Sequence, residues 1–405
     1  YANIAGDGGD GGSGTGGTAL FLAQGGTING QDVDFTASGN GGSGGAAGTY
    51  LYGGVNGVSG VGGTGTGGTA AIEVQEGSPG IITLANVTMG ANGNNPGDTP
   101  GLPTGFGGRI EITDTSTDPA GLISLASLNA QALNIASGPN GGFFVTGNSG
   151  AIAILGDLTV NVAGNIEYAL DGNGQMTVGG NADLVSSQNI LLGHSNNSLP
   201  VPSLDVAGNI SAIAGGDFNS GAGSQIIAGG TLNIQASGNA LAADLVAVDR
   251  LQIVANGNVT LGNGILTGTP STPPSGPVFY PSINIIAGLN AFGVPTTFNS
   301  NFNATITGAV SSTGNISVDS GGSLIVQSGA NIRADNRIQF RTGDDIIIRS
   351  GSSVTGAINP FVALDPSNPF ANQAIVSLDA GGINGAQLIN PLLSPISSIV
   401  AAGTI

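Results

Sequence analysis

The sequence predicts an all-β chain folded as a parallel β-solenoid, and three observations predict it. Short strands of alternating polarity recur with the same residue types, Gly-Asn pairs separate them, and no helical segment lies between them. Glycine accounts for 75 of the 405 residues, which raises the alternative of a disordered coil. Because 40% of the residues are hydrophobic, the chain is too apolar for that alternative.

The clearest repeat occurs three times, at Leu158–Asn165, Leu232–Asn239 and Leu251–Asn258. Each copy reads apolar, polar, apolar, variable, apolar, small, Gly, Asn, and the last two copies are 19 residues apart. The alternation makes a strand with one buried face, and the Gly-Asn pair suits a sharp corner. Because a propeller blade needs about 40–45 residues, we interpret the interval as one solenoid coil. We therefore expect Leu to stack on Leu and Asn on Asn.

The first 68 residues contain 26 glycines and a longer repeat. The segment Gly14-Thr-Gly-Gly-Thr-Ala19 recurs at Gly65–Ala70, 51 residues later, and each copy leads into an apolar strand. These features predict coils with long Gly-rich loops leaving one corner. Glycine follows no strict three-residue period through the chain, which excludes collagen.

Composition shifts divide the chain into five predicted segments. They are Gly-rich coils with long loops (1–105), a regular solenoid (106–265), a Pro-rich insertion (266–300), a second solenoid stretch (301–358), and a C-terminal cap or inter-subunit segment (359–405).

Two of these patterns resemble known surface proteins. The pattern GG-x-L-x-I-x-A-x-GN-x-L at Gly229–Leu241 resembles the hemagglutinin repeats of filamentous-hemagglutinin-like adhesins. The Gly-Thr-Gly-Gly-Thr-Ala blocks resemble those of very large β-strand-repeat surface proteins of alphaproteobacteria. The resemblance implies a right-handed parallel β-helix, export to the surface of a Gram-negative bacterium, and a structural or adhesive role.

Charge and composition exclude several function classes. A net charge of −18 argues against nucleic acid and anionic membrane surfaces as partners. No apolar run approaches the roughly 18–20 residues of a membrane span. The chain has no Cys, and its single histidine, His194, cannot build a zinc site alone.

Four of the six arginines fall in one window, at Arg333, Arg337, Arg341 and Arg349, near the pair Asp344 and Asp345. Three interpretations are open. The first is ion pairing on one outer face, and the second is an interface between subunits, because arginine pairs well with carboxylate. The third is a glycoside hydrolase that uses the paired carboxylates. Since the chain lacks the further residues of β-helical pectin-degrading hydrolases, we expect no enzyme.

The segment Gly6–Gly12 places Asp7 and Asp10 in a Gly-rich context similar to the calcium turns of secreted repeat proteins. The repeat is incomplete, and Ca²⁺ needs six to eight oxygen ligands. We therefore expect no resident cofactor, with calcium at Asp7 and Asp10 as the alternative.

These features predict an extracellular structural protein that assembles head to tail with itself into a filament, sheath or adhesin stalk. The apolar C-terminal residues Ile375, Val376, Leu378, Ile399 and Val400 are the predicted joining element. The alternative is an adhesive module that binds polysaccharide or another cell-surface component.

Overall fold

The computed structural model describes most of the chain, and all of its regular structure is β. The described residues form 37 strands, and none of them lies in a helix long and apolar enough to cross a membrane. The described residues are 5–49, 55–75, 80–94, 105–115, 121–133, 141–147, 151–170, 175–193, 201–221, 224–270, 280–289, 298–356, 375–380 and 399–401.

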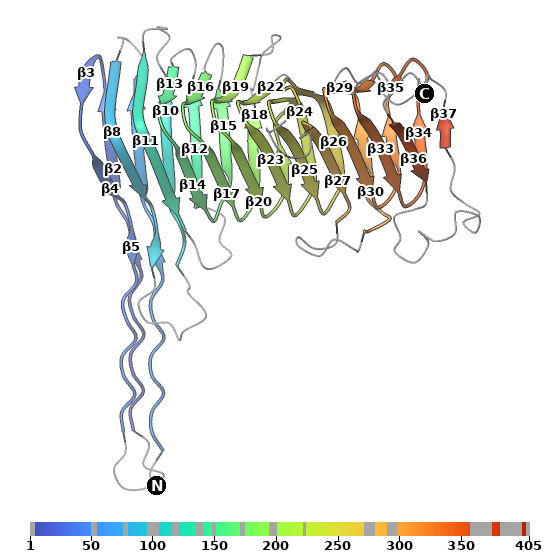
Figure 1. The fold of residues 1–405 in the computed structure, drawn as a ribbon. Coiled ribbons are helices and arrows are strands. Elements are labelled where there is room, and N and C mark those ends of the chain that lie inside the picture. The colour runs from blue at the N-terminus through green and yellow to red at the C-terminus, as the bar shows by residue number, and fades with distance from the viewer. Residues whose placement is uncertain are drawn as a thin grey trace, which may run out of the picture. The chain divides into compact units, whose positions relative to one another are not determined.

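The chain divides into two compact units. Unit 1 comprises Tyr1–Thr177 and Asp183–Asn189, and unit 2 comprises Val178–Ala182 and Ile190–Ile405. Within each unit, strands of successive coils pair in parallel, so each unit is a β-solenoid as predicted (Figure 1).

Three strands of each coil in unit 1 stack on their counterparts in the next coil. One sheet contains β2 (Thr18–Ala23), β7 (Thr69–Val74), β10 (Arg109–Asp114), β12 (Gly142–Gly147) and β15 (Ile166–Leu170). The long strands β8 (Gly80–Gly90) and β11 (Leu122–Ala132) each serve both other sheets. These two sheets also contain β3 (Gly26–Asn29), β4 (Val33–Thr36), β13 (Ala151–Ile154) and β14 (Leu158–Val162). Next along the chain come β16 (Gln175–Val178) and β17 (Ala182–Ser186).

Unit 2 repeats this plan. Its first sheet contains β20 (Ile210–Ala214), β23 (Thr231–Ala236), β25 (Arg250–Ala255), β27 (Ser282–Ala287), β30 (Asn315–Ser320), β33 (Arg337–Thr342) and β36 (Ile375–Ala380). The second contains β18 (Ile190–Gly193), β21 (Phe218–Asn219), β24 (Ala240–Ala247), β26 (Val259–Leu266), β28 (Ala304–Ile306), β31 (Leu324–Val326), β34 (Ile346–Ile348) and β37 (Ile399–Ala401). The third joins the ends of β24 and β26 with β19 (Val201–Val206), β22 (Ser224–Ala228), β29 (Ala309–Ser312), β32 (Asn331–Ala334) and β35 (Ser353–Gly356).

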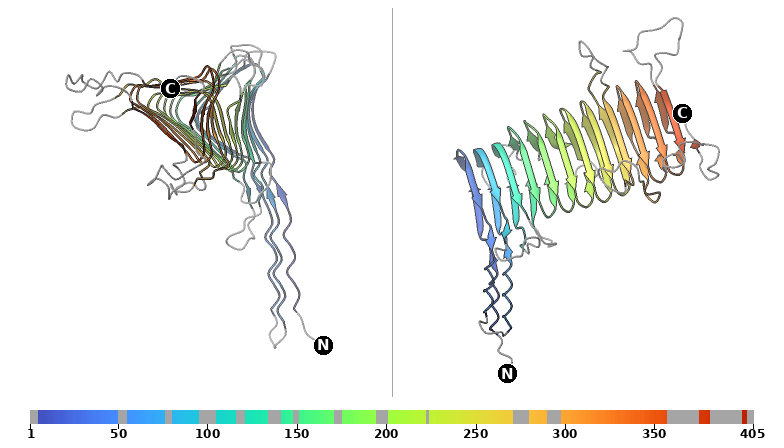
Figure 2. Two further views of the ribbon diagram at one scale, coloured as in Figure 1. Left: turned by 90° about the vertical axis from the view of Figure 1, so that its right-hand side faces the viewer. Right: turned by 60° about the horizontal axis from the view of Figure 1, so that its bottom comes forward.

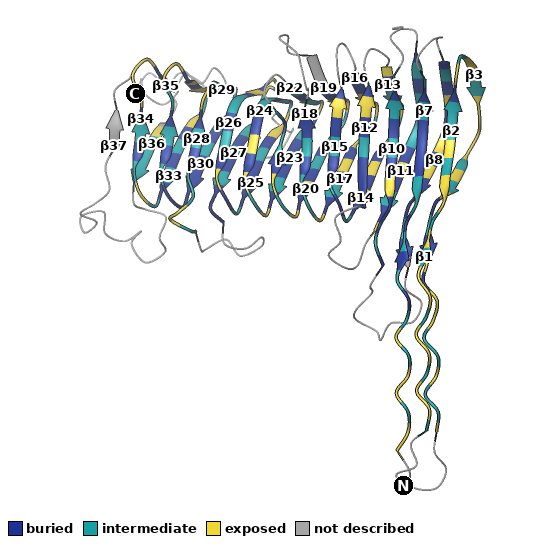
Figure 3. Ribbon diagram, turned by 180° about the vertical axis from the view of Figure 1, so that it is seen from behind, coloured by how far each residue is buried: buried dark blue, intermediate teal, exposed yellow. Residues whose placement is uncertain are grey.

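The core of each unit consists of columns of aliphatic side chains. Leu232 lies beside Leu251, which confirms the predicted 19-residue coil, and Ile283 continues the same column. All three side chains are fully buried, and each contributes about 1.5–3 kcal/mol of hydrophobic stabilisation. Figure 3 shows the resulting alternation of buried and more exposed residues along the strands.

Side chains at one corner of unit 2 connect successive coils, and we call this arrangement the corner ladder. The backbone N–H of Asn239 donates to Oδ1 of Asp217 (2.6 Å), and that of Asn258 donates to Oδ1 of Asn239 (2.9 Å). The ladder continues from Asn303 N–H to Asn258 Oδ1 (2.8 Å) and from Ser323 N–H to Asn303 Oδ1 (2.7 Å). Asn therefore stacks on Asn as predicted, because its amide oxygen accepts the bond that a corner N–H needs.

The Gly-rich segments of unit 1 form a bundle of three extended chains, which we call the prong. It contains residues 5–16, 39–49 and 55–67, and Figures 1 and 2 show it leaving the coils near β5 (Gly39–Asn40). The 51-residue repeat aligns the first and third chains, since β1 (Gly14–Thr15) pairs in parallel with β6 (Gly65–Thr66). The middle chain runs antiparallel to both, and its other short pairing is with β9 (Gly93–Asn94).

Hydrogen bonds in the prong recur at every third residue. In the first chain Gly8, Gly11 and Gly14 donate to carbonyls of the third chain. The third chain donates in the same way to the middle chain from Gly57, Gly60 and Gly63, and the middle chain donates to the first from Gly42, Gly45 and Gly48. A three-residue repeat with all bonds between chains is the pattern of polyproline II helices packed together. The sequence pattern predicts long loops here, whereas the structure shows three chains that are hydrogen-bonded to one another.

Packing explains which prong residues must be glycine. A Cβ on Gly11 would overlap the carbonyl oxygen of Gly42, and one on Gly8 would overlap that of Gly45. A Cβ on Gly9 or Gly12 would point into open space. In the first chain of the prong, every third residue therefore faces an interior that is made of backbone atoms only, as in collagen.

The variants Gly11→Ala and Gly12→Ala test this interior. We expect Gly11→Ala to force the chains apart at a cost of about 1–3 kcal/mol and to remove the hydrogen-exchange protection of the Gly42 and Gly45 amides. Gly12→Ala should leave that protection unchanged, because its methyl group meets no neighbour. Equal protection in the two variants would contradict the packing that we describe.

Candidate functional site

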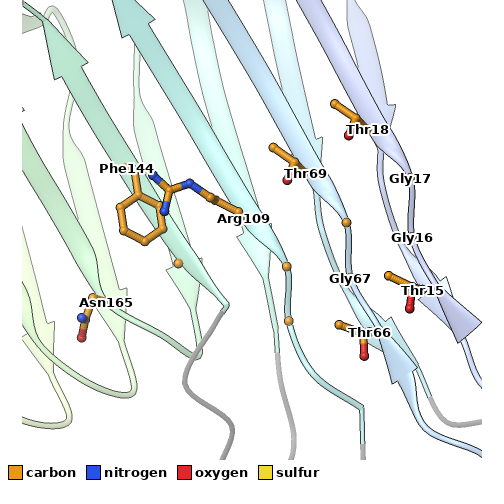
Figure 4. Close-up of a pocket in the computed structure, with 14 residues that line it drawn as sticks. Thr15, Gly16, Gly17, Thr18, Thr66, Gly67, Thr69, Arg109, Phe144 and Asn165 are labelled. Atoms are coloured by element: carbon orange, nitrogen blue, oxygen red, sulfur yellow. The ribbon is translucent and has the colours of Figure 1, made fainter. Parts of the chain in front are cut away.

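A groove of about 450 Å³ lies on the outer face of unit 1, where strands of successive coils begin. Figure 4 shows its lining, which comes from the starts of β2, β7, β10 and β12 and from the corner residue Asn165. Its volume is within the range of about 300–1,000 Å³ typical of ligand sites.

The groove is hollow because a glycine pair precedes or opens each of these strands. The pairs are Gly16–Gly17, Gly67–Gly68, Gly107–Gly108 and Gly141–Gly142. The strand register stacks them, since Thr18 lies beside Thr69, Thr69 beside Arg109, and Arg109 beside Gly142. Backbone rather than side chains therefore forms the floor.

Four threonines border the first two glycine pairs. Thr15 and Thr66 lie on one side of the pairs, and Thr18 and Thr69 lie on the other (Figure 4). Their hydroxyl groups make no hydrogen bond in the part of the chain that the structure describes. They are available as donors and acceptors for a ligand.

Among the described residues that line the groove, Arg109 is the one with a charged side chain. Its guanidinium carbon lies 3.7 Å from the ring centroid of Phe144, a cation–π contact. Its Nε donates to Glu111, which forms an ion pair with it. Because Gly142 is the register neighbour of Arg109, no side chain stands between the guanidinium and Phe144.

Sequence reasoning missed this groove. Arg109 and Phe144 are distant in the sequence and come into contact because they lie in adjacent coils, on the paired strands β10 and β12. The signal that could have found it is the recurrence of a glycine pair before apolar strands, together with the first arginine of the chain.

On the opposite face of the same sheet, Tyr168 is buried in the core. Its ring packs edge-on against Phe143 with centroids 6.1 Å apart, and its hydroxyl has no hydrogen-bond partner among the described residues. Burial raises the pKa of the Tyr168 phenol above its ordinary value.

The predicted arginine cluster of unit 2 does not form a single site. Arg341 forms a bidentate ion pair with Asp319, in which Nε donates to Oδ1 (2.7 Å) and Nη2 donates to Oδ2 (2.6 Å). The hydrogen bond to Asp319 raises the pKa of Arg341, and the charge of Asp379 adds to this effect. The register explains the arrangement, because Asp319, Arg341 and Asp379 occupy equivalent positions in three successive coils.

The other members of the cluster lie apart from this pair. Arg333 approaches Asp335 at 3.5 Å on the surface, and neither Arg337 nor Arg349 has an ion pair among the described residues. Asp344 is exposed, whereas the backbone N–H of Asp345 donates to Ser323 and extends the corner ladder.

The predicted calcium ligands connect two chains of the prong. Oδ1 of Asp7 accepts a hydrogen bond from Val58 N–H (2.7 Å), and Oδ1 of Asp10 accepts one from Val61 N–H (2.9 Å). No group of three potential metal-binding His, Cys, Asp or Glu side chains occurs in the described part of the chain. Calcium at this position stays a prediction.

The predicted joining residues lie in two strands at the end of unit 2. Ile375, Val376 and Leu378 are in β36, which pairs with β33, and Ile399 and Val400 are in β37, which pairs with β34. His194, residues 271–279 and 290–297 of the predicted Pro-rich insertion, and most of residues 359–405 lie outside the described residues. Between these two parts of the predicted insertion, β27 is a regular solenoid strand, so the segment 266–300 is not one continuous insertion.

Comparisons with the models of known protein families, with curated proteins and with solved structures give no match. The resemblance to surface adhesins therefore stays a prediction.

The ionisation of Tyr168 predicts a pH effect on stability. The tyrosine of the unfolded chain ionises near pH 10, whereas the buried phenol resists ionisation. Its contribution to the free energy of unfolding is therefore constant below about pH 10 and decreases above it, by up to about 1.4 kcal/mol per pH unit. Tyr168→Phe should remove this part of the alkaline loss and stabilise unit 1 at neutral pH by about 1 kcal/mol. Urea unfolding at several pH values measures both effects, and an unchanged alkaline slope would contradict the prediction.

The two arginine ion pairs of unit 2 should differ in their contribution to stability. Arg341→Gln leaves the buried carboxylate of Asp319 without its charged partner and should cost about 2–3 kcal/mol. Arg333→Gln removes an exposed pair and should cost less than about 1 kcal/mol. Denaturant midpoints of the two variants test this order, and the reverse order would contradict it.

Proposed function

We propose that this chain is a structural β-solenoid of the bacterial cell surface that stacks end to end with further copies of itself. The product would be a filament, a sheath or the stalk of an adhesin. The observation that carries the proposal is the open edge of the first coil. In the described structure, β2 pairs only with β7, and β3 and β4 pair only with β8.

The first coil also leaves apolar side chains incompletely covered. Phe21 and Phe35 contact each other with ring centroids 5.4 Å apart, and both are only half-buried. Ile72, the neighbour of Phe21 in the next coil, is fully buried. A further coil placed on this end would bury both rings, and unpaired strand edges readily accept another strand.

β36, the last described strand of its sheet in unit 2, offers an edge of the same length. The β2 sheet leads by strand pairing to β37 and not to β36, so this joint requires one copy to be turned about the solenoid axis relative to the next. In β36 the side chain of Val376 is 37% exposed, whereas its register neighbour Ile338 is buried. Both β2 and β36 have six residues, and in both the second, fourth and sixth point inward. If Phe21 of one copy lies beside Leu378 of another, the inward residues of the two strands coincide.

The mechanism of such a protein is mechanical. Parallel backbone ladders and aliphatic columns would run across the joint from copy to copy, and a non-closing contact of this kind generates filaments. The net charge of −18 would keep filaments apart laterally. We propose no enzymatic reaction, because Asp344 is exposed, Asp345 is half-buried beside the corner ladder, and neither lines the groove of unit 1.

Engineered disulfides test this joint, since the chain contains no Cys of its own. In the proposed register Leu20 of one copy faces the same side as Ser377 of the next. Their Cα atoms would be about 4.8 Å apart, within the range that a disulfide spans. We expect an oxidised mixture of Leu20→Cys and Ser377→Cys chains to form mixed dimers efficiently.

The matched control replaces Ser377→Cys with Asp379→Cys, which is two residues out of register and should crosslink poorly. Deletion of residues 374–405 should abolish filaments in electron micrographs and leave a folded monomer. Filaments that persist after the deletion, or equal crosslinking at 377 and 379, would refute the proposed joint.

A further inference from the structure

The groove of unit 1 crosses successive coils, so a ligand in it would lie across the strands. The lining residues belong to five strands or corners in succession, from Thr18 in β2 to Asn165 before β15. At about 4.8 Å per coil, the first and fifth positions are about 19 Å apart. This shape suits an extended chain molecule rather than a compact one.

The backbone of the floor is already hydrogen-bonded. The N–H of Thr69 donates to Gly17 O (3.0 Å), that of Arg109 to Gly68 O (2.8 Å), and that of Gly142 to Gly108 O (3.1 Å). A peptide strand adds to a sheet through free backbone groups at an edge, which this face does not offer. Recognition must therefore come from side chains.

The side chains available here suit sugar hydroxyl groups. Four threonine hydroxyls without a partner in the described structure follow the coil spacing, and they both donate and accept. The Nη groups of Arg109 add donors on the next strand, β10, and contact with Phe144 fixes their orientation. A pyranose unit of an extended chain is about as long as one coil spacing, so consecutive sugars meet consecutive coils.

The surrounding charge favours a neutral ligand. Arg109 is the only arginine in the first 249 residues, and there is no lysine. Its charge is offset by Glu111, and Glu167 lies two coils away in the same outward row. An acidic polysaccharide would meet net repulsion from a chain of charge −18.

One glycine of the lining is not explained by packing. A Cβ on Gly67, Gly68 or Gly108 would overlap backbone atoms, so those positions require glycine. A Cβ on Gly17 would meet nothing within 4 Å, and the φ of Gly17 is not positive. The consequence of glycine at position 17 is an open groove.

From these observations we propose that the groove binds a linear neutral polysaccharide, with about four sugar units lying across the coils. The threonine hydroxyls and Arg109 bind the sugar hydroxyls, and the glycine floor lets the chain approach the backbone. This proposal does not depend on end-to-end stacking, because all of its residues are in unit 1.

A plugged groove provides the test. Gly17→Tyr adds a bulky side chain at the floor of the groove, and Gly12→Tyr adds the same side chain on the prong; at both positions a Cβ meets no protein atom within 4 Å. The full chain and both variants are titrated by calorimetry with cellopentaose, β-1,4-mannopentaose and tetragalacturonate. We expect saturable binding of a neutral pentaose, at least tenfold weaker for Gly17→Tyr and unchanged for Gly12→Tyr.

A second variant, Thr69→Val, keeps the side-chain shape and removes one hydroxyl, so it should weaken binding several-fold. Absence of saturable binding of both neutral probes would overturn the proposal. So would unchanged binding in Gly17→Tyr, and tighter binding of tetragalacturonate would overturn the neutral class. Filament formation is scored separately in the same variants, so that failure of the groove and failure of the joint are distinguishable.

Discussion

The constraint on which the rest of this structure depends is in-register stacking of one coil on the next. Every strand of a coil donates and accepts backbone hydrogen bonds with the equivalent strand of its neighbour. Residues at equivalent positions of successive coils therefore lie beside one another, and where the repeat keeps the residue type, a contact that is favourable in one coil recurs in the next. The buried column through Leu232, Leu251 and Ile283 and the corner ladder through Asn239 and Asn258 are both results of this rule.

The same rule produces the groove and the prong of unit 1. Glycine pairs stacked in register remove side chains from one line of the outer face, and the backbone then forms a continuous floor. In the prong the period changes from two residues to three, and glycine at every third position lets three chains share one interior. A single device, glycine aligned by the repeat, gives a concave surface in one place and a solid bundle in the other.

The sequence predicts the fold where its pattern coincides with the coil. Leu232 and Leu251 hold equivalent positions in the sequence repeat and are register partners in the structure, and Gly14 and Gly65 are related in the same way. Prediction fails where the partner of a side chain lies in the next coil and the number of residues between the two cannot be read from the sequence repeat. Asp344 is close to the arginine cluster in the sequence and was the expected partner. In the structure Arg341 instead pairs with Asp319, because one coil of 22 residues separates the two. The three-residue period of the prong is hard to predict for a related reason. It occurs in three short segments that are separate in the sequence, and each segment forms its hydrogen bonds only with the other two.

Successive steps of the corner ladder span 22, 19, 45 and 20 residues of chain, although each step joins equivalent positions of adjacent coils. The number of residues between two successive corners can therefore vary, whereas the strands keep their register with the neighbouring coils. Segments can enter or leave between strands by insertion and deletion, and the core is not altered by such events. Insertions between strands would therefore reshape the surface of such a protein and leave the stacked residues of its interior in place.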